Sequence, residues 1–175
     1  MKIVAIIPAA FLAFVSARGD DFDVWSAPSP NKAFFAAERR IPDADMLQRL
    51  DLDGFRVVVF ADDKVYARRD FPLRLVSDIK WSPDSHFLLF TTASSGGHSP
   101  WHFKTFVFCV SDRSFRDVEG VTGGSVLVPE VRFEPPDIVV LTVHDTGAPE
   151  SDAEMPSKQV RIPLAKMSHH MKRLR

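Results

Sequence analysis

A short motif recurs three times along the chain at a spacing of roughly 50 residues, and it limits the possible folds more than any other feature. Each copy has a proline-containing turn with Asn or Asp, followed by an apolar run. The copies lie at residues 29–36, 82–91 and 134–142. Proline presets the turn, and the Asn or Asp side chain can hydrogen-bond its own backbone there. Because the runs are rich in Phe, Val, Leu and Thr, the repeat predicts an all-β fold built from similar antiparallel segments.

Each copy predicts a small antiparallel sheet of three or four strands. The expected strands are residues 32–37, 55–61 and 64–68 in the first copy, 78–82, 86–93, 103–110 and 114–118 in the second, and 130–133, 138–143 and 158–164 in the third. Asp62-Asp63 fits a tight hairpin turn. The third copy has no fourth strand in this interpretation.

The strand expected at 103–110 has apolar residues on both faces. Phe106, Phe108 and Val110 alternate with Val107 and Cys109, a pattern typical of a strand that is covered on both sides. Cys109 is therefore predicted to be a small buried hydrophobic residue rather than a reactive thiol. As the only cysteine, it leaves no possibility of an internal disulfide.

Two helices are expected between or after these strands. Residues 42–52 place Met46, Leu47 and Leu50 on one face, and Asp43 can cap the start. Residues 164–175 form a second amphipathic pattern with a basic end, which complements a helix C-terminus. Its apolar face consists of Leu164, Met167, Met171 and Leu174. Contact with acidic lipid is one use for such a segment, but packing on a sheet edge is the favoured one.

The second copy resembles the blade repeat of TolB-like β-propellers. Trp81-Ser82-Pro83-Asp84 followed by an apolar strand matches the tryptophan-Ser-Pro-Asp-Gly form of that repeat, with Ser85 in place of glycine. The other two copies match weakly, since Trp25 lies too far from its turn and Phe133 replaces the tryptophan. The resemblance implies propeller-like packing of the sheets. A closed propeller needs at least four blades, so we expect an open or incomplete propeller-like assembly. A monomer is favoured, and a homodimer that completes a six-bladed ring is the alternative.

The first 17 residues resemble a secretory signal. Lys2 precedes an apolar stretch at residues 3–15, and Val15-Ser16-Ala17 offers small residues for cleavage. The stretch is too short to span a bilayer, which needs about 20 apolar residues. We therefore expect a periplasmic or secreted protein with residues 18–175 as a single domain and no stable membrane insertion.

The charge of the chain argues against one class of partner. The formal net charge is −1, and it becomes −2 when Lys2 leaves with the signal. Nucleic-acid-binding domains are usually basic. We therefore expect no nucleic-acid partner.

The long insertions fall at the same place in each copy, at residues 38–54, 94–102 and 144–157. Insertions at one position of a repeat map to one face, which is often the binding face. The second insertion contains His98, Trp101 and His102, and the third begins with His144 and Asp145. These five residues are the candidate ligand- or partner-binding residues, because Trp and His contribute strongly to contacts.

Three functions remain open at this stage. The leading hypothesis is a non-enzymatic interaction module without a cofactor, which holds an envelope protein or polymer. The second is a metal-binding protein or metal-dependent hydrolase that uses His98, His102, His144 and Asp145 as nitrogen and oxygen ligands. The third is a structural envelope protein without a discrete site. Nucleophile-elbow, phosphate-loop and dinucleotide motifs are absent from the sequence.

Overall fold

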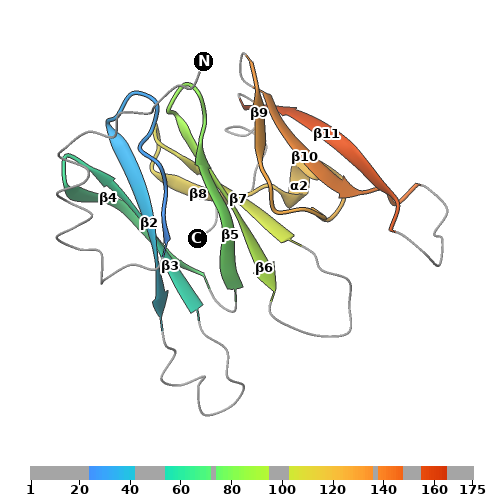
Figure 1. Cartoon of the computed structure of the whole chain (residues 1–175), viewed down its shortest axis with the longest axis horizontal. Coiled ribbons are helices and arrows are strands. Elements are labelled where there is room, and N and C mark those ends of the chain that lie inside the picture. The colour runs from blue at the N-terminus through green and yellow to red at the C-terminus, as the bar shows by residue number, and fades with distance from the viewer. Residues whose placement is uncertain are drawn as a thin grey trace, which may run out of the picture.

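Three antiparallel sheets follow one another along the chain and stand side by side from left to right in Figure 1. The computed structural model describes residues 24–41, 54–71, 74–94, 103–135, 138–147 and 155–164. The N-terminal sheet contains β1 (Val24–Trp25), β2 (Phe34–Ile41), β3 (Gly54–Ala61) and β4 (Lys64–Phe71) in that order. The central sheet contains β5 (Arg74–Trp81), β6 (Phe87–Ser94), β7 (Phe103–Cys109) and β8 (Ser114–Asp117). The C-terminal sheet contains β9 (Arg132–Glu134), β10 (Ile138–His144) and β11 (Ser157–Pro163), with β10 in the middle.

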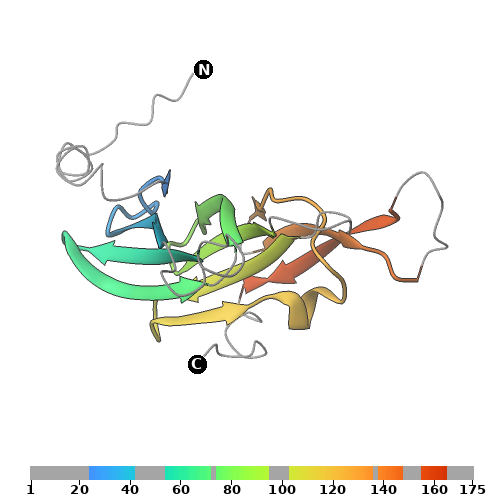
Figure 2. The ribbon, with the colours of Figure 1, turned by 90° about the horizontal axis from the view of Figure 1, so that it is seen from below.

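These strands confirm the predicted all-β class, and none of the three sheets closes on itself. A short helix, α2 (Glu119–Thr122), joins the central and C-terminal sheets. Together with β8 it lies along the lower side of the molecule in the view of Figure 2. No helix among the described residues is long and apolar enough to cross a membrane.

Several strands are longer than predicted. β2 continues to Ile41 instead of ending at residue 37, and β5 begins at Arg74 instead of residue 78. The backbone pairing of β2 with β3 extends to Ile41 opposite Gly54, so the ladder persists where the apolar pattern stops. The expected signal at 1–17, the helix at 42–52 and residues 165–175 of the C-terminal helix lie outside the described residues. Leu164 is described and is buried in the core.

The first motif copy folds into a turn that is fixed by side-chain hydrogen bonds. The Ser29 hydroxyl donates to Asn31 Oδ1 at 2.7 Å and accepts from the Phe34 N–H at 3.0 Å. Asn31 Oδ1 also accepts from the Ala33 N–H at 3.0 Å. Lys32 adopts a left-handed backbone conformation with φ of 60°.

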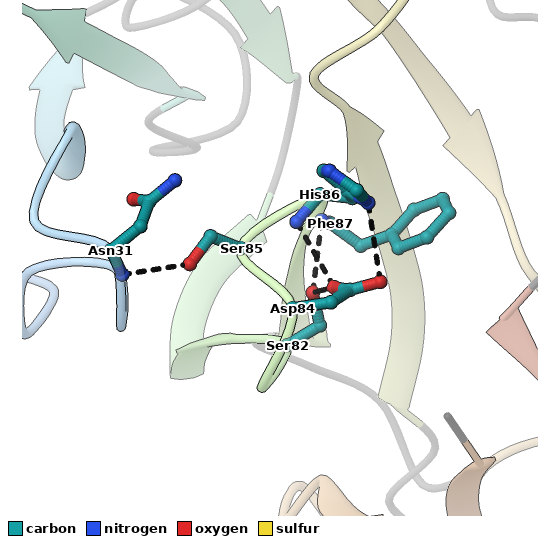
Figure 3. A network of polar contacts seen from close by, with 6 residues as sticks. All are labelled: Asn31, Ser82, Asp84, Ser85, His86 and Phe87. Atoms are coloured by element: carbon teal, nitrogen blue, oxygen red, sulfur yellow. Dashed lines mark hydrogen bonds and ion pairs between the residues drawn. The ribbon is translucent and has the colours of Figure 1, made fainter. Parts of the chain in front are cut away.

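The second copy repeats this turn bond for bond, as Figure 3 shows. The Ser82 hydroxyl donates to Asp84 Oδ1 and accepts from the Phe87 N–H at 3.0 Å, while Asp84 Oδ1 accepts from the His86 N–H at 3.0 Å. Ser85 takes the left-handed position with φ of 63°. The sequence repeat is thus a repeat of turn geometry in these two copies.

The third copy has a shorter turn. Glu134 pairs directly with Ile138, four residues along, whereas the Ser82 N–H donates to the carbonyl of Phe87, five residues along. Glu134 also lacks the hydroxyl that organises the first two turns. This copy is therefore equivalent in position but not in geometry.

An aromatic core joins the N-terminal and central sheets. Trp81 crosses between them, since its indole Nε1 donates to Ser26 Oγ at 3.2 Å and its ring stacks on Phe34 with centroids 5.8 Å apart. Phe71 packs against Phe90 and Phe106 at 5.3 and 4.9 Å. Such ring pairs contribute beyond their buried area, and they hold these two sheets together.

A second, mostly aliphatic core lies between the central and C-terminal sheets. β7 contributes to both cores, with Phe106 and Phe108 in the aromatic one and Val107 and Cys109 in the aliphatic one. This confirms the predicted strand with two covered faces. Cys109 is buried as expected, and desolvation raises the pKa of its thiol to about 11.

Candidate functional site

The three long connections occupy equivalent places in the three sheets. Residues 42–53 join β2 to β3, residues 95–102 join β6 to β7, and residues 145–156 join β10 to β11. In an antiparallel meander these connections leave from one end, and the short turns occupy the other. Figure 1 shows the corresponding strand ends along the lower and right-hand side of the molecule. The predicted equivalence of the insertions is therefore confirmed in position.

A single residue, Val126, links the strand ends next to the second and third connections. Val126 forms a bridge with Phe103 on one side and with Val143 on the other. The Phe103 N–H donates to the Val126 carbonyl at 2.8 Å, and the His144 N–H donates to the Ser125 carbonyl at 2.8 Å. Adjacent strands are about 4.8 Å apart, so the backbones of Phe103 and Val143 lie roughly 10 Å from each other. The second connection thus returns to its sheet close to where the third departs.

Gly124 makes this close approach possible. A Cβ atom at this position would lie 2.4 Å from the carbonyl oxygen of His144. This clash is with a backbone atom, so it could be relieved only by moving the backbone. The residue must therefore remain glycine for segment 125–127 to pair with the end of β10.

His144 lies at the end of β10 with its ring partly buried. Its Nε2 atom is fully buried and has no hydrogen-bond partner among the described residues. A buried polar atom without a partner is costly, and in native proteins it usually indicates a bound water, an ion or a functional role.

Asp145 is already engaged by a neighbouring cation. Its Oδ1 accepts hydrogen bonds from Lys158 Nζ at 2.9 Å and from the Gly147 N–H at 3.2 Å. These contacts, with the Lys158 hydrogen bond first, hold the pKa of Asp145 below its ordinary value. Asp145 is therefore ionised near neutral pH, and the ammonium beside it competes with any metal cation. The sequence analysis did not find Lys158, since it lies 13 residues away on another strand.

The other three candidate residues belong to the second connection. His98, Trp101 and His102 lie outside the described residues. Within the described part of the chain, no group of three or more His, Cys, Asp or Glu side chains is arranged to hold a metal ion. The set of His98, His102, His144 and Asp145 therefore remains a prediction.

No protein-family model matches the chain, and no curated protein matches it significantly. The solved structure of an uncharacterized protein from Listeria monocytogenes EGD-e is similar, with a TM-score of 0.48, 13% sequence identity and coverage of 88% of this chain. This chain spans 40% of the length of that protein.

Proposed function

We propose that the protein is an exported, non-enzymatic binding module that holds an envelope protein or polymer at the end bearing its long connections. The supporting observation is the bridge through Val126, because it holds together the strand ends at which two of these connections join the sheets. Loops positioned by a rigid scaffold are where binding residues usually occur. The signal predicted at residues 1–17 and the absence of nucleophile-elbow, phosphate-loop and dinucleotide motifs from the sequence are further grounds for the proposal.

The fold proposed for this module is an open array related to TolB-like propellers. The identical turns of the first two copies support it, as do the packed cores between successive sheets. In this proposal residues 164–175 form a helix that packs on the edge of the last sheet, and the protein is a monomer.

A quantitative pull-down from envelope extract tests the binding end. The test variant carries His98→Ala, Trp101→Ala and His144→Ala, and the control carries His86→Ala, an exposed residue in a turn at the opposite end. We expect the triple variant to lose a specifically enriched partner and the control to retain it. Equal recovery by both variants would show that this end is not the binding site. Mass spectrometry of exported protein checks the signal, with residue 18 expected at the new N-terminus.

A metal-binding protein or metal-dependent hydrolase is the second candidate, and the buried Nε2 of His144 is the observation that favours it. Elemental analysis of the mature protein, purified without chelators, separates it from the first. Stoichiometric zinc, copper, nickel or iron that is lost in His144→Ala would support a metal site, while a metal-free protein would reject it.

A further inference from the structure

The C-terminal sheet has one face in the core and, because side chains alternate along a strand, a second face opposite it. Val139, Leu141 and Ile162 pack in the aliphatic core against the central sheet. Side chains alternate along a strand, so their neighbours Val140 and Arg161 belong to the opposite face. We call this opposite face the outer face of the C-terminal sheet. By the strand register this face contains Arg132 and Glu134 on β9, Ile138, Val140, Thr142 and His144 on β10, and Ser157, Gln159, Arg161 and Pro163 on β11.

A polar network spans this outer face. Arg132 and Arg161 both pair with Val140 in the strand register, so they lie on either side of it. Both guanidinium groups bind the one carboxylate of Glu134, with Arg132 Nη2 at 3.2 Å from Oε1 and Arg161 Nη2 bonded to Oε2. Arg132 Nη2 also donates to Gln159 Oε1 at 3.4 Å. Glu134 therefore holds the two arginines in place across the width of the sheet.

The two guanidinium groups keep most of their hydrogen-bonding capacity for solvent. The Arg132 and Arg161 side chains are 58% and 57% exposed, whereas Glu134 is 24% exposed. Each guanidinium has five N–H donors, and the contacts described above use only the Nη2 nitrogen of each. One carboxylate balances only one of the two charges, so the network has a formal charge of +1 in a chain whose net charge is −1. Among the described residues, the network thus leaves one unbalanced positive charge on this face.

We propose that the outer face of the C-terminal sheet binds the anionic groups of an extended acidic polysaccharide. Arginine forks suit carboxylate and sulfate groups because they donate two parallel hydrogen bonds. Orientation by Glu134 lowers the cost of ordering these side chains on binding. A membrane-binding face would need exposed apolar side chains, and Val140, at the centre of this one, is only 4% exposed. The two arginines lie beside Val140, four residues before the loop-bearing end of β10 at His144, so this proposal does not depend on the proposed function.

Binding of defined polymers to the purified full-length mature protein tests the proposal. Polygalacturonate, dextran sulfate and neutral dextran are titrated at low and high salt, with vesicles of anionic phospholipid as a further arm. The test variant is Arg132→Gln with Arg161→Gln. The control is Arg39→Gln with Arg68→Gln, which removes the same charge from exposed positions of the N-terminal sheet.

We expect binding to one or both acidic polymers, none to neutral dextran, and weakening by salt. The test variant should bind about tenfold more weakly or worse, because charge-assisted hydrogen bonds are lost, and the control should bind as the wild type does. Preference for the carboxylated or the sulfated polymer identifies the anionic group. Equal weakening in both variants, failure to bind any acidic polymer, or binding to vesicles alone would overturn the proposal. Both arginines are exposed, so the thermal midpoint of the test variant should change little.

Discussion

The left-handed turn residues Lys32 and Ser85 give a matched test of the repeat. They occupy the same position in equivalent turns, with φ of 60° and 63°. Backbone strain at a non-glycine residue in this conformation costs the folded state about 1–2 kcal/mol, which glycine would relieve. Glycine also increases the conformational entropy of the unfolded chain, which opposes this gain by about 0.5–1 kcal/mol. Lys32 is exposed, so Lys32→Gly should raise the free energy of unfolding by about 0.5–1 kcal/mol.

Ser85→Gly should behave differently because the Ser85 side chain has a second role. It is 1% exposed, and its hydroxyl accepts a hydrogen bond at 3.0 Å from the Asn31 N–H of the first turn (Figure 3). Loss of such a bond costs about 0.5–1.5 kcal/mol, which offsets the relief of backbone strain. We therefore expect Ser85→Gly to be neutral or mildly destabilising, about 1 kcal/mol less stable than Lys32→Gly.

Equilibrium unfolding in urea measures both variants against the wild type. A stability change with an unchanged m-value shows that the unfolded reference is the same, and 1 kcal/mol corresponds to about 2–4 °C in the thermal midpoint at this chain length. If Lys32→Gly lowers the midpoint, the two turns are not strained in the way described. If Ser85→Gly gains as much as Lys32→Gly, the bond between the turns contributes nothing to stability.

Three further predictions concern buried groups. Thr105 Oγ1 is buried without a partner among the described residues, so Thr105→Val should raise the free energy of unfolding in urea by about 1 kcal/mol. Thr91→Val should lower it by about the same amount, because it removes the 2.7 Å hydrogen bond from Thr91 Oγ1 to the Pro129 carbonyl. A Thr91→Val variant more stable than Thr105→Val would contradict this. Burial raises the pKa of the Cys109 thiol from its ordinary value of 9.0 to about 11. As the pH rises the thiol therefore ionises first in the unfolded state, so the free energy of unfolding falls between these two values. Between pH 8 and 10.5 the free energy of unfolding should fall more for the wild type than for Cys109→Ala. The native protein should also resist alkylation by iodoacetamide at pH 8. Equal decreases in the two proteins, or rapid alkylation, would show that the thiol is accessible. The free energy of unfolding of His144→Leu should lie within about 1 kcal/mol of the wild-type value, because the substitution removes a buried nitrogen that has no partner among the described residues. A decrease of more than about 2 kcal/mol would indicate a bound group at Nε2.

Local chemistry explains how much of the fold was predictable. The Ser-Pro-Asn and Ser-Pro-Asp turns are determined by neighbouring residues, and strands such as β7 carry an alternation that specifies both faces. Turn and alternation together predicted the order of the strands and the position of the long connections. Each of these features depends on residues within a few positions of one another.

The features that escaped prediction depend on residues that are distant in sequence. Val126 lies in a segment without periodicity, and its two bridges exist only because the central and C-terminal sheets pack together. Lys158 reaches Asp145 across a strand pair, and no local pattern encodes that contact. A signal was available for Gly124, because the pair Gly123-Gly124 indicates a tight turn with a close backbone approach.

The outer face of the C-terminal sheet also bears on how the array of sheets ends. A six-bladed ring of two chains would require this face to pack against the N-terminal sheet of a second copy. The interfaces within the chain are built from apolar rings and branched side chains, whereas this face presents Arg132, Glu134 and Arg161 in ion pairs. Their burial would remove three charges from water, a cost that such pairs rarely recover. Terminal units of repeat arrays carry polar outer faces for this reason, and this face therefore supports the proposed open monomer over the two-chain ring.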